Sequence, residues 1–434
     1  MRSCLILLSN HLAEETKLLA DDVYILCEPL PRPQFKFHKL RLAYTRAVCM
    51  ASKFKMIIYQ DLDRIGKDYM RIKVYDPLDF DILDLFIKKF NSKLEVLELQ
   101  KSFMLDQNKM QNLRSQFSGR KWVAHSSFYK QVKSMFHILE NVDSTDKENR
   151  KPLPKTHKLT TLPPRIRENN SICKSAIDFV NAKFPNNPGE TDFLYSLPLT
   201  KKQAEKYYAK FLRERFALFG TYQDAIHSDD VLVYHSHISY LLNHGLLTPQ
   251  YVIKKALKAP NIPPNSREAF IRQVLGWREF CRFIYCYYGR QMKKQLIQHK
   301  GKQLPFKQWY TGTTGIMPID NEISKVIKYA WSHHIVRLMV FLNFMKLNNI
   351  KAFDIYKWFS EFVSLDVVEY LMVSNIAAMG YYAHNPKFTH KPYLSSSNYI
   401  RTMSNYKNDG KWNISWDKAY RKKVDYPKNP EKSY

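Results

Sequence analysis

The sequence predicts a two-part fold: an α/β domain with an open, Rossmann-like parallel sheet, followed by a larger all-α domain. Over residues 1–137, short apolar runs alternate with stretches of helical periodicity. Over residues 193–434, the periodicity is helical and strand signals become rare. Residues 138–192 between them are polar and contain many prolines, which indicates an interdomain linker laid over a surface.

Five segments of the first domain are expected to be strands. Most are short apolar runs, as buried parallel strands tend to be. The last run is interrupted by Glu95 and Glu98, so we expect it at an edge of the sheet. The five segments are Leu5–Leu8, Val23–Cys27, Met56–Tyr59, Ile72–Tyr75 and Leu94–Leu99.

Two helices are expected among these strands, over Phe37–Lys53 and Asp79–Phe90, so the sheet should carry helices on its faces. The first glycine of the chain is Gly66, and therefore no G-x-G-x-x-G motif follows the first strand. The sequence thus does not support a nicotinamide or flavin dinucleotide site of the usual type in this domain.

The second domain opens with a clear helix signal. Thr200 is expected to cap a helix over Lys201–Phe216. Further along, residues 268–288 carry a single apolar stripe and are expected to form a long helix. Arg278 and Glu279 sit beside that stripe, either as an ion pair or as charged groups that face a ligand.

A third helix is expected over residues 331–344, and it is apolar enough to be buried. The same segment contains His333, His334 and Arg337. A buried arginine needs an anionic or dipolar partner, because an unpaired buried charge is costly. The segment is therefore either a core helix with an ion pair or the wall of a functional pocket.

The chain is strongly basic, with 68 Lys and Arg against 40 Asp and Glu, a net charge of +28. This surplus indicates a polyanionic partner, with nucleic acid first and an anionic membrane surface second. The alternative is a general compositional bias toward lysine.

The sequence predicts an intracellular protein that does not span a membrane. Its start has a short apolar run without a small-residue cleavage site and is expected to be a strand, not a signal peptide. No run of about 18 apolar residues occurs. None of the six cysteines forms a C-x-x-C pair, so neither a zinc site nor a redox dithiol is expected.

Two stretches of the second domain point to a phosphate or nucleic-acid ligand. His235-Ser-His-Ile-Ser239 precedes an expected helix and can offer hydroxyl and N–H groups to a phosphate, although a serine-rich cap is the simpler interpretation. Between Tyr381 and Trp412, aromatic and basic residues interleave. This pattern suits unstacked bases, which stack on rings while cations hold the phosphates.

Several longer motifs occur in one order along nearly the whole chain. They are Phe37-His-Lys39, Asp146-Lys-Glu-Asn-Arg-Lys-Pro152, Phe219-Gly-Thr-Tyr-Gln-Asp-Ala225, His235-Ser-His-Ile-Ser239, Phe270-Ile-Arg-Gln-Val-Leu-Gly-Trp-Arg-Glu-Phe280, Thr314-Gly-Ile-Met-Pro-Ile-Asp320, His333-His-Ile-Val-Arg-Leu-Met339, Trp358 and Lys391-Pro-Tyr393. Together they resemble the cryptochrome and photolyase family, in particular the bacterial (6-4) photolyase branch that carries an iron–sulfur cluster.

The resemblance implies an N-terminal α/β antenna-type domain and a helical domain that holds a U-shaped FAD. In the family, the serine motif holds the FAD phosphates, and an aspartate pairs with the arginine of the histidine helix near the flavin ring. The implied cofactor-binding residues are His235, Ser236, Ser239, Arg278, Arg337, Asp366 and Asn375.

The resemblance also implies roles in catalysis and DNA binding. His333 and His334 match histidines that face the lesion, where one manages a proton. Tyr393 matches a lesion-pocket tyrosine, and Trp358 matches a tryptophan that relays electrons to the flavin. The lesion must leave the duplex to reach the flavin. The implied DNA-binding residues are Lys391, Tyr399 and Arg401.

Some positions depart from the branch's pattern. Pro318, Lys407 and Gly410 stand where the branch has cluster cysteines, so we expect no iron–sulfur cluster and no metal site. Phe359 replaces a relay tyrosine, and Met372 replaces a carboxylate near the flavin. The first-strand motif of the antenna site is also changed, to Ser-Asn-His-Leu, so the antenna chromophore is left open.

These features lead to one expectation and two alternatives. We expect a monomeric, FAD-dependent photolyase-like enzyme that repairs UV-damaged DNA by light-driven electron transfer, with (6-4) photoproducts as the first choice of lesion. The alternatives are a cryptochrome-like flavin photoreceptor without repair activity and a flavin-free DNA-binding protein on a photolyase scaffold.

Overall fold

The computed structural model describes the chain except for residues 1, 17–18, 146–147, 367, 390–392 and 425–434. Its N-terminal part contains a five-stranded, fully parallel sheet in the order β3-β2-β1-β4-β5, which confirms the predicted sheet. The last strand lies at the edge, as its interrupted apolar run predicted. The strands are β1 (Ser3–Leu7), β2 (Asp22–Leu26), β3 (Lys55–Ile57), β4 (Arg71–Tyr75) and β5 (Leu94–Leu97).

Alternate residues of the strands face opposite layers of helices, as the period of two requires. Leu5 and Leu7 of β1 pack in the same core as α1 (Lys39–Ala51). Cys4 and Ile6 pack on the other side with α2 (Asp61–Asp68) and α3 (Phe80–Phe90). The core on the α1 side continues without interruption into the helical domain, so the two domains share one apolar interior.

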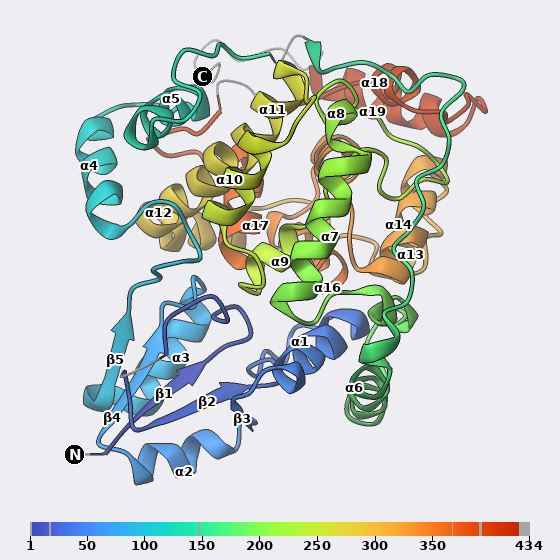
Figure 1. Ribbon diagram of the computed structural model, residues 1–434. Coiled ribbons are helices and arrows are strands. Elements are labelled where there is room, and N and C mark those ends of the chain that lie inside the picture. Colours follow the sequence, from blue (N-terminus) through green and yellow to red (C-terminus); the bar gives the residue numbers. More distant parts are fainter. Residues whose placement is uncertain (1, 17–18, 146–147, 367, 390–392, 425–434) are drawn as a thin grey trace.

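The polar segment 138–192 is only partly irregular. Its first part runs along the outside of the helical domain (Figure 1), as expected of a linker. It then forms α6 (Asn170–Lys183), which packs against α1. Sequence reasoning missed this helix because prolines flank it on both sides. Its buried residues Cys173, Ala176 and Val180 have the spacing of a helical face.

The remainder of the chain is almost entirely helical. Thr200 caps α7 (Lys201–Glu214), as predicted: its hydroxyl oxygen accepts a hydrogen bond from the backbone N–H of Gln203 at 3.3 Å. The other α-helices after β5 are α4 (Gln107–Phe117), α5 (His125–Phe136), α8 (Phe216–Phe219), α9 (Ser239–Asn243), α10 (Pro249–Lys258), α11 (Pro264–Ile271), α12 (Glu279–Gln298), α13 (Phe306–Thr311), α14 (Met317–Tyr329), α15 (Asn343–Leu347), α16 (Ala352–Phe362), α17 (Glu369–Ile376), α18 (Ser397–Met403) and α19 (Trp412–Val424). Short 3-10 turns are η1 (Asn91–Lys93), η3 (Arg167–Asn169) and η4 (Asp192–Ser196).

Three segments of the helical domain are wound as π-helix, which is rare and occurs often at functional sites. They are η5 (Arg272–Arg278) between α11 and α12, η6 (Val336–Leu342) before α15, and η7 (Ala377–Tyr381) after α17. The long helix predicted over 268–288 is therefore present but contains a wide turn. Among the described helices, none is long and apolar enough to cross a bilayer.

The helix predicted over 331–344 starts later than expected. Residues 331–333 are not helical, and the helix begins at His334 and continues into η6 at Val336. The preceding helix α14 ends at Tyr329, and Ala330 directly after it has a left-handed conformation, with φ of 49°. Apolar residues stand on both sides of this break, so periodicity alone could not locate it.

Candidate functional site

A cavity of about 860 Å³ opens in the helical domain. Its volume lies within the range typical of sites for organic ligands and cofactors. The walls come from α5, the loop before α9, all three π segments and α17. It brings together eleven of the residues expected from the sequence: His235, Ser236, Ser239, Arg278, His333, His334, Arg337, Asp366, Asn375, Tyr393 and Tyr399.

Three of the expected residues do not line this cavity among the described residues. Trp358 is fully buried, and its Nε1 donates to the carbonyl of Trp309 at 3.0 Å. Its ring lies 4.9 Å from that of Phe341, a residue of η6, so Trp358 sits behind the cavity wall. Arg401 is exposed on α18, outside the lining. Lys391 lies outside the described residues.

Arg337 and Asp366 meet as an ion pair at one wall of the cavity. Arg337 projects from η6, and Asp366 lies just before α17 with only 1% of its surface exposed. The backbone carbonyl of Asp366 accepts the side-chain amide of Asn243 at 2.8 Å, which helps to hold this segment in place. Burial lowers the pKa of Arg337 to about 10, so the guanidinium is still charged at neutral pH.

The two adjacent histidines have different neighbours. His333 stacks on His235 of the serine motif, with ring centres 4.3 Å apart and planes inclined by 17°. His334 lies 6.2 Å from Trp277 of η5. Residues 331–333 are not helical, so His333 lies before the helix and His334 lies at its start. The two side chains therefore have different neighbours, although both line the cavity. His333 therefore lies beside the motif expected to hold phosphates, whereas His334 lies along the wall formed by η5.

All these imidazoles are neutral at physiological pH. Burial, followed by the charge of Arg337, lowers the pKa of His235 and of His334 to about 3. Burial and the neighbouring ring of His235 also lower the pKa of His333 well below its ordinary value. A neutral imidazole keeps one donor and one acceptor, so each of the three can bind a polar ligand in either sense.

Many buried polar atoms around the cavity have no hydrogen-bond partner in the described part of the chain. An unsatisfied buried polar atom costs roughly 1–3 kcal/mol, so such a concentration in one place is unusual for a protein interior. The atoms are His235 Nε2, His237 Nε2, Trp277 Nε1, Arg278 Nε, His333 Nδ1 and Asp366 Oδ1. With the serine hydroxyls and arginines beside them, they fit a large, polar, anionic ligand such as FAD.

His237 and Trp277 are among the cavity residues that sequence reasoning did not name as site residues. His237 lies inside the serine motif, where its Nδ1 is 2.6 Å from the hydroxyl of Tyr207. Trp277 belongs to the apolar stripe of the helix expected over 268–288, and in the structure it lies in η5 and lines the cavity. The sequence could have indicated His237, because it lies between Ser236 and Ser239, which are both expected to bind the cofactor. No simple sequence pattern indicates the π turn that contains Trp277.

No group of three or more His, Cys, Asp and Glu side chains that could hold a metal ion occurs within the described chain. Cys281 is fully buried on α12, where burial raises the pKa of its thiol. Pro318, Lys407 and Gly410 have no thiol group, so none of them can bind iron as a thiolate. The expected lack of an iron–sulfur cluster stays a prediction.

Comparisons with known proteins show the family to which the chain belongs and the fold that it shares. A profile of the family described as deoxyribodipyrimidine photo-lyase-related protein matches residues 52–195. The (6-4) photolyase of Agrobacterium fabrum (strain C58 / ATCC 33970) is 30% identical over 351 residues, which cover 77% of this chain and 67% of that protein. The match extends well beyond the first domain.

Two solved structures share the fold at low sequence identity. A bacterial class III photolyase from Agrobacterium tumefaciens superposes with a TM-score of 0.57 and 16% identity, over 93% of this chain and 86% of that chain. The Synechocystis sp. PCC6803 cryptochrome gives 0.59 and 14%, over 93% and 88%. The predicted fold and the resemblance are thereby confirmed, and the chain belongs to the photolyase and cryptochrome family.

Proposed function

We propose that this chain is an FAD-dependent photolyase that repairs UV-damaged DNA by light-driven electron transfer, with the (6-4) photoproduct as its lesion. The observation that carries the proposal is the single cavity that gathers the serine motif, the Arg337–Asp366 pair and both histidines. The similar Agrobacterium protein is named a (6-4) photolyase, which supports the choice of lesion.

The cavity residues divide into groups suited to different parts of FAD. Bound FAD would supply light absorption and one-electron transfer. Ser236 and Ser239 offer hydroxyls to the phosphates, and Arg278 offers its unpaired Nε. The Arg337–Asp366 pair places opposite charges side by side, so it can present both a donor and an acceptor to a polar ring.

His334 is the residue we propose for proton handling at the lesion. Burial lowers its pKa to about 3, so the imidazole is neutral at physiological pH and holds no acidic proton of an imidazolium. Negative charge that develops on a bound lesion would raise this pKa, because an opposite charge stabilises the protonated imidazole. Proton exchange is thereby tied to the arrival of charge on the substrate.

The surroundings of the cavity suit a damaged strand. Tyr393 lines it and exposes 52% of its surface, so its ring is available to stack on an extruded base. Arg401 is exposed on α18 and can contact a phosphate. The net charge of +28 favours DNA binding, with an affinity that falls steeply as salt rises.

A cryptochrome-like photoreceptor without repair activity is the second candidate. Two replacements favour it: Phe359 stands where the similar branch has a relay tyrosine, and Met372, buried on α17, stands where it has a carboxylate. The similarity in fold to the Synechocystis cryptochrome is compatible with this candidate. Repair and signalling can use the same flavin cavity, so the fold does not separate them.

The proposal is tested in two steps on the purified chain. Flavin content is measured first from the absorbance spectrum in the dark. The chain is then illuminated with oligonucleotides that contain either a (6-4) photoproduct or a cyclobutane dimer, and the restored bases are measured by chromatography. Light-dependent loss of the (6-4) product is the expected result. Bound flavin without repair of either lesion would favour the photoreceptor, and a chain that binds no flavin would reject both.

A further inference from the structure

The exposed aromatic side chains of the described chain lie at the large cavity of the helical domain. The sequence contains 7 Trp, 28 Tyr and 26 Phe residues. Within the described ranges, only Trp122 and Tyr393 among them are exposed, at 42% and 52%. Both line the large cavity. Exposed rings that gather at one place are typical of a binding surface, since apolar surface is otherwise kept from water.

The two rings come from different domains. Trp122 lies between α4 and α5, at the end of the α/β domain, and α5 packs on η5 and α12 of the helical domain (Figure 1). His125, the first residue of α5, contacts Trp277 of η5 with ring centres 5.2 Å apart. Trp277 in turn lies 6.2 Å from His334. The α/β domain therefore forms part of the cavity wall on the side of the proposed proton-handling residue.

The backbone on both sides of Trp122 is held in place. The N–H of Val123 donates to the carbonyl of Lys387 at 3.0 Å, and the N–H of Lys387 donates to the carbonyl of Lys121 at 3.0 Å. These bonds join the segment to the helical domain as a short parallel bridge. Val123 is fully buried. The exposed indole is thus carried by a fixed main chain, so a partner that stacks on it would cost little ordering of the protein.

The charged groups near Trp122 in the sequence suit a nucleic acid. Arg120 and Lys121 precede it directly, and both are exposed. Neither forms an ion pair within 4.0 Å in the described part of the chain. Exposed Glu140 and Asp143 also line the cavity, so its edge is not uniformly basic. A base that has left the duplex offers free faces to aromatic rings, while its phosphates need cations.

We propose that Trp122 stacks on an unstacked base of the damaged strand beside the lesion, and that the α/β domain thereby takes part in recognising damaged DNA. This inference rests on the proposed function and adds to it a contact from the other domain. A base within an intact duplex has no free face for the indole. Trp122 should therefore increase the preference for damaged over intact DNA and leave the electrostatic part of the affinity unchanged.

The test measures the affinity of the full-length chain for two labelled duplexes of the same sequence, in the dark, by fluorescence anisotropy. One duplex contains a single (6-4) photoproduct and the other is undamaged. Trp122→Ala should weaken binding to the damaged duplex about tenfold, as expected for loss of one aromatic ring that stacks on a base. Its affinity for the undamaged duplex should change by less than about twofold, because phosphate contacts dominate that binding.

Further variants separate stacking from other effects of the substitution. Trp122→Leu keeps an apolar side chain without a ring and should bind like Trp122→Ala, whereas Trp122→Phe keeps a ring and should restore most of the affinity. Ile297→Ala is the matched control, because it removes a side chain that is 59% exposed on α12 and outside the cavity lining. It should bind both duplexes like the wild type. The dependence of affinity on salt should be the same in all variants, since no charge is changed.

The possible outcomes distinguish this inference from the proposed function. A wild-type chain that does not prefer the damaged duplex would overturn both. A preference that Trp122→Ala keeps in full would overturn only the role of Trp122. Equal weakening of both duplexes by Trp122→Ala would also overturn that role, because stacking on an unstacked base cannot act on intact DNA. Loss of the preference with normal binding of the undamaged duplex is the result that supports it.

Discussion

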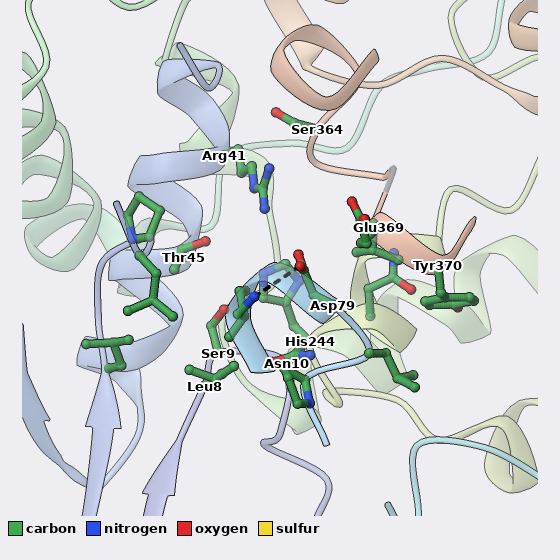
Figure 2. A pocket seen from close by; sticks show the side chains of 18 of the residues that line it. Leu8, Ser9, Asn10, Arg41, Thr45, Asp79, His244, Ser364, Glu369 and Tyr370 are labelled. Carbon is green, nitrogen blue, oxygen red and sulfur yellow. Dashed lines mark hydrogen bonds between the residues drawn. The ribbon is translucent and has the colours of Figure 1, made fainter. Parts of the chain in front are cut away.

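Two cavities of the chain differ in how their polar groups are matched. Around the large cavity, buried nitrogen and oxygen atoms of several side chains lack partners within the described chain, and the histidines are kept neutral. Around a smaller cavity of about 150 Å³ between the two domains (Figure 2), every lining carboxylate forms an ion pair: Asp79 with Arg32, Glu28 with Lys183 and Glu369 with Lys293. Leu242, Asn243, Arg278 and Tyr370 line both, so the cavities share a wall.

This contrast separates a site that needs a ligand from one that is largely satisfied by its own side chains. The large cavity lacks hydrogen-bond partners of both kinds, which is what a big ligand with many polar atoms would supply. Around the small cavity, Arg32 contacts Asp79 and Asp81, and Lys293 contacts Asp81 and Glu369. Substitutions at the large cavity should therefore act on ligand binding, whereas substitutions at the small cavity should act mainly on stability.

The largest effect is expected from Ser236→Ala combined with Arg337→Ala. Loss of the hydroxyl and of the guanidinium removes two expected contacts to FAD and leaves Asp366 buried without its partner. Breaking a buried pair in this way costs roughly 3–5 kcal/mol. We expect no bound flavin in the absorbance spectrum, with folding checked by circular dichroism. Ser324→Ala combined with Arg401→Ala, both exposed, is the matched control and should keep its flavin. Normal flavin content in the first variant would refute this assignment.

The next effect concerns catalysis without loss of cofactor. His333→Ala and His334→Ala should each keep FAD but lower the rate of (6-4) repair by roughly 10² to 10⁴, the usual contribution of a positioned acid or base. The measurement is the rate of repair under constant illumination, with flavin content determined for each variant. His137→Ala removes an exposed imidazole and should repair at the wild-type rate. An unchanged rate in both variants would remove the histidines from the mechanism.

A third effect compares two arginines of the small cavity. Arg32→Met leaves Asp79 buried without a partner and should lower the free energy of unfolding by roughly 3–5 kcal/mol. Arg41→Met removes a cation that has no carboxylate within 4.0 Å among the described residues, and it should change this free energy by less than about 1 kcal/mol. Urea unfolding of both variants tests the contrast. Equal losses would show that Arg41 is matched by charge in the same way as Arg32.

The smallest effect is the dependence of stability on pH. His235 and His334 have pKa values of about 3 in the folded chain and about 6.5 when unfolded. Below pH 6.5 the unfolded state binds protons that the folded state does not, so stability is lost as pH falls toward 3. Each histidine should contribute roughly 1.4 kcal/mol per pH unit in this window. Unfolding of wild type and His334→Asn at pH 7 and pH 5 measures the difference; parallel curves would contradict it.

Local patterns in the sequence were sufficient for the sheet, and the family motifs named eleven of the residues that line the large cavity. The strands follow from apolar runs, and the serine motif, Arg337 and the histidines follow from a set of motifs in a fixed order. The contact between His333 and His235 could not be predicted, because it depends on the break at residue 333. That break lies between two apolar stretches and changes no periodicity.

The small cavity was beyond sequence reasoning for a different reason. Ser9, Arg41 and Glu369 belong to a loop, a helix and another domain, and nothing in the neighbouring sequence of each connects it with the others. Arg41 looks like an ordinary exposed position of the predicted helix over Phe37–Lys53. It lies in a cavity only because the helical domain closes over the ends of the strands.

Two of the π segments have a consequence for how relatives of this chain should be aligned. A π turn holds one residue more than the same length of α-helix, so η5 and η6 each contain a residue that a regular helix would lack, whereas η7 contains a kink at Gly380, with φ of 79°. A homologue with regular winding at η6 would be one residue shorter there. An alignment without a gap would then turn every later position by about 100° and match Arg337 to a residue on another face. A gap of one residue at either segment would therefore indicate a relative whose helix is wound regularly there, with a differently shaped cavity wall.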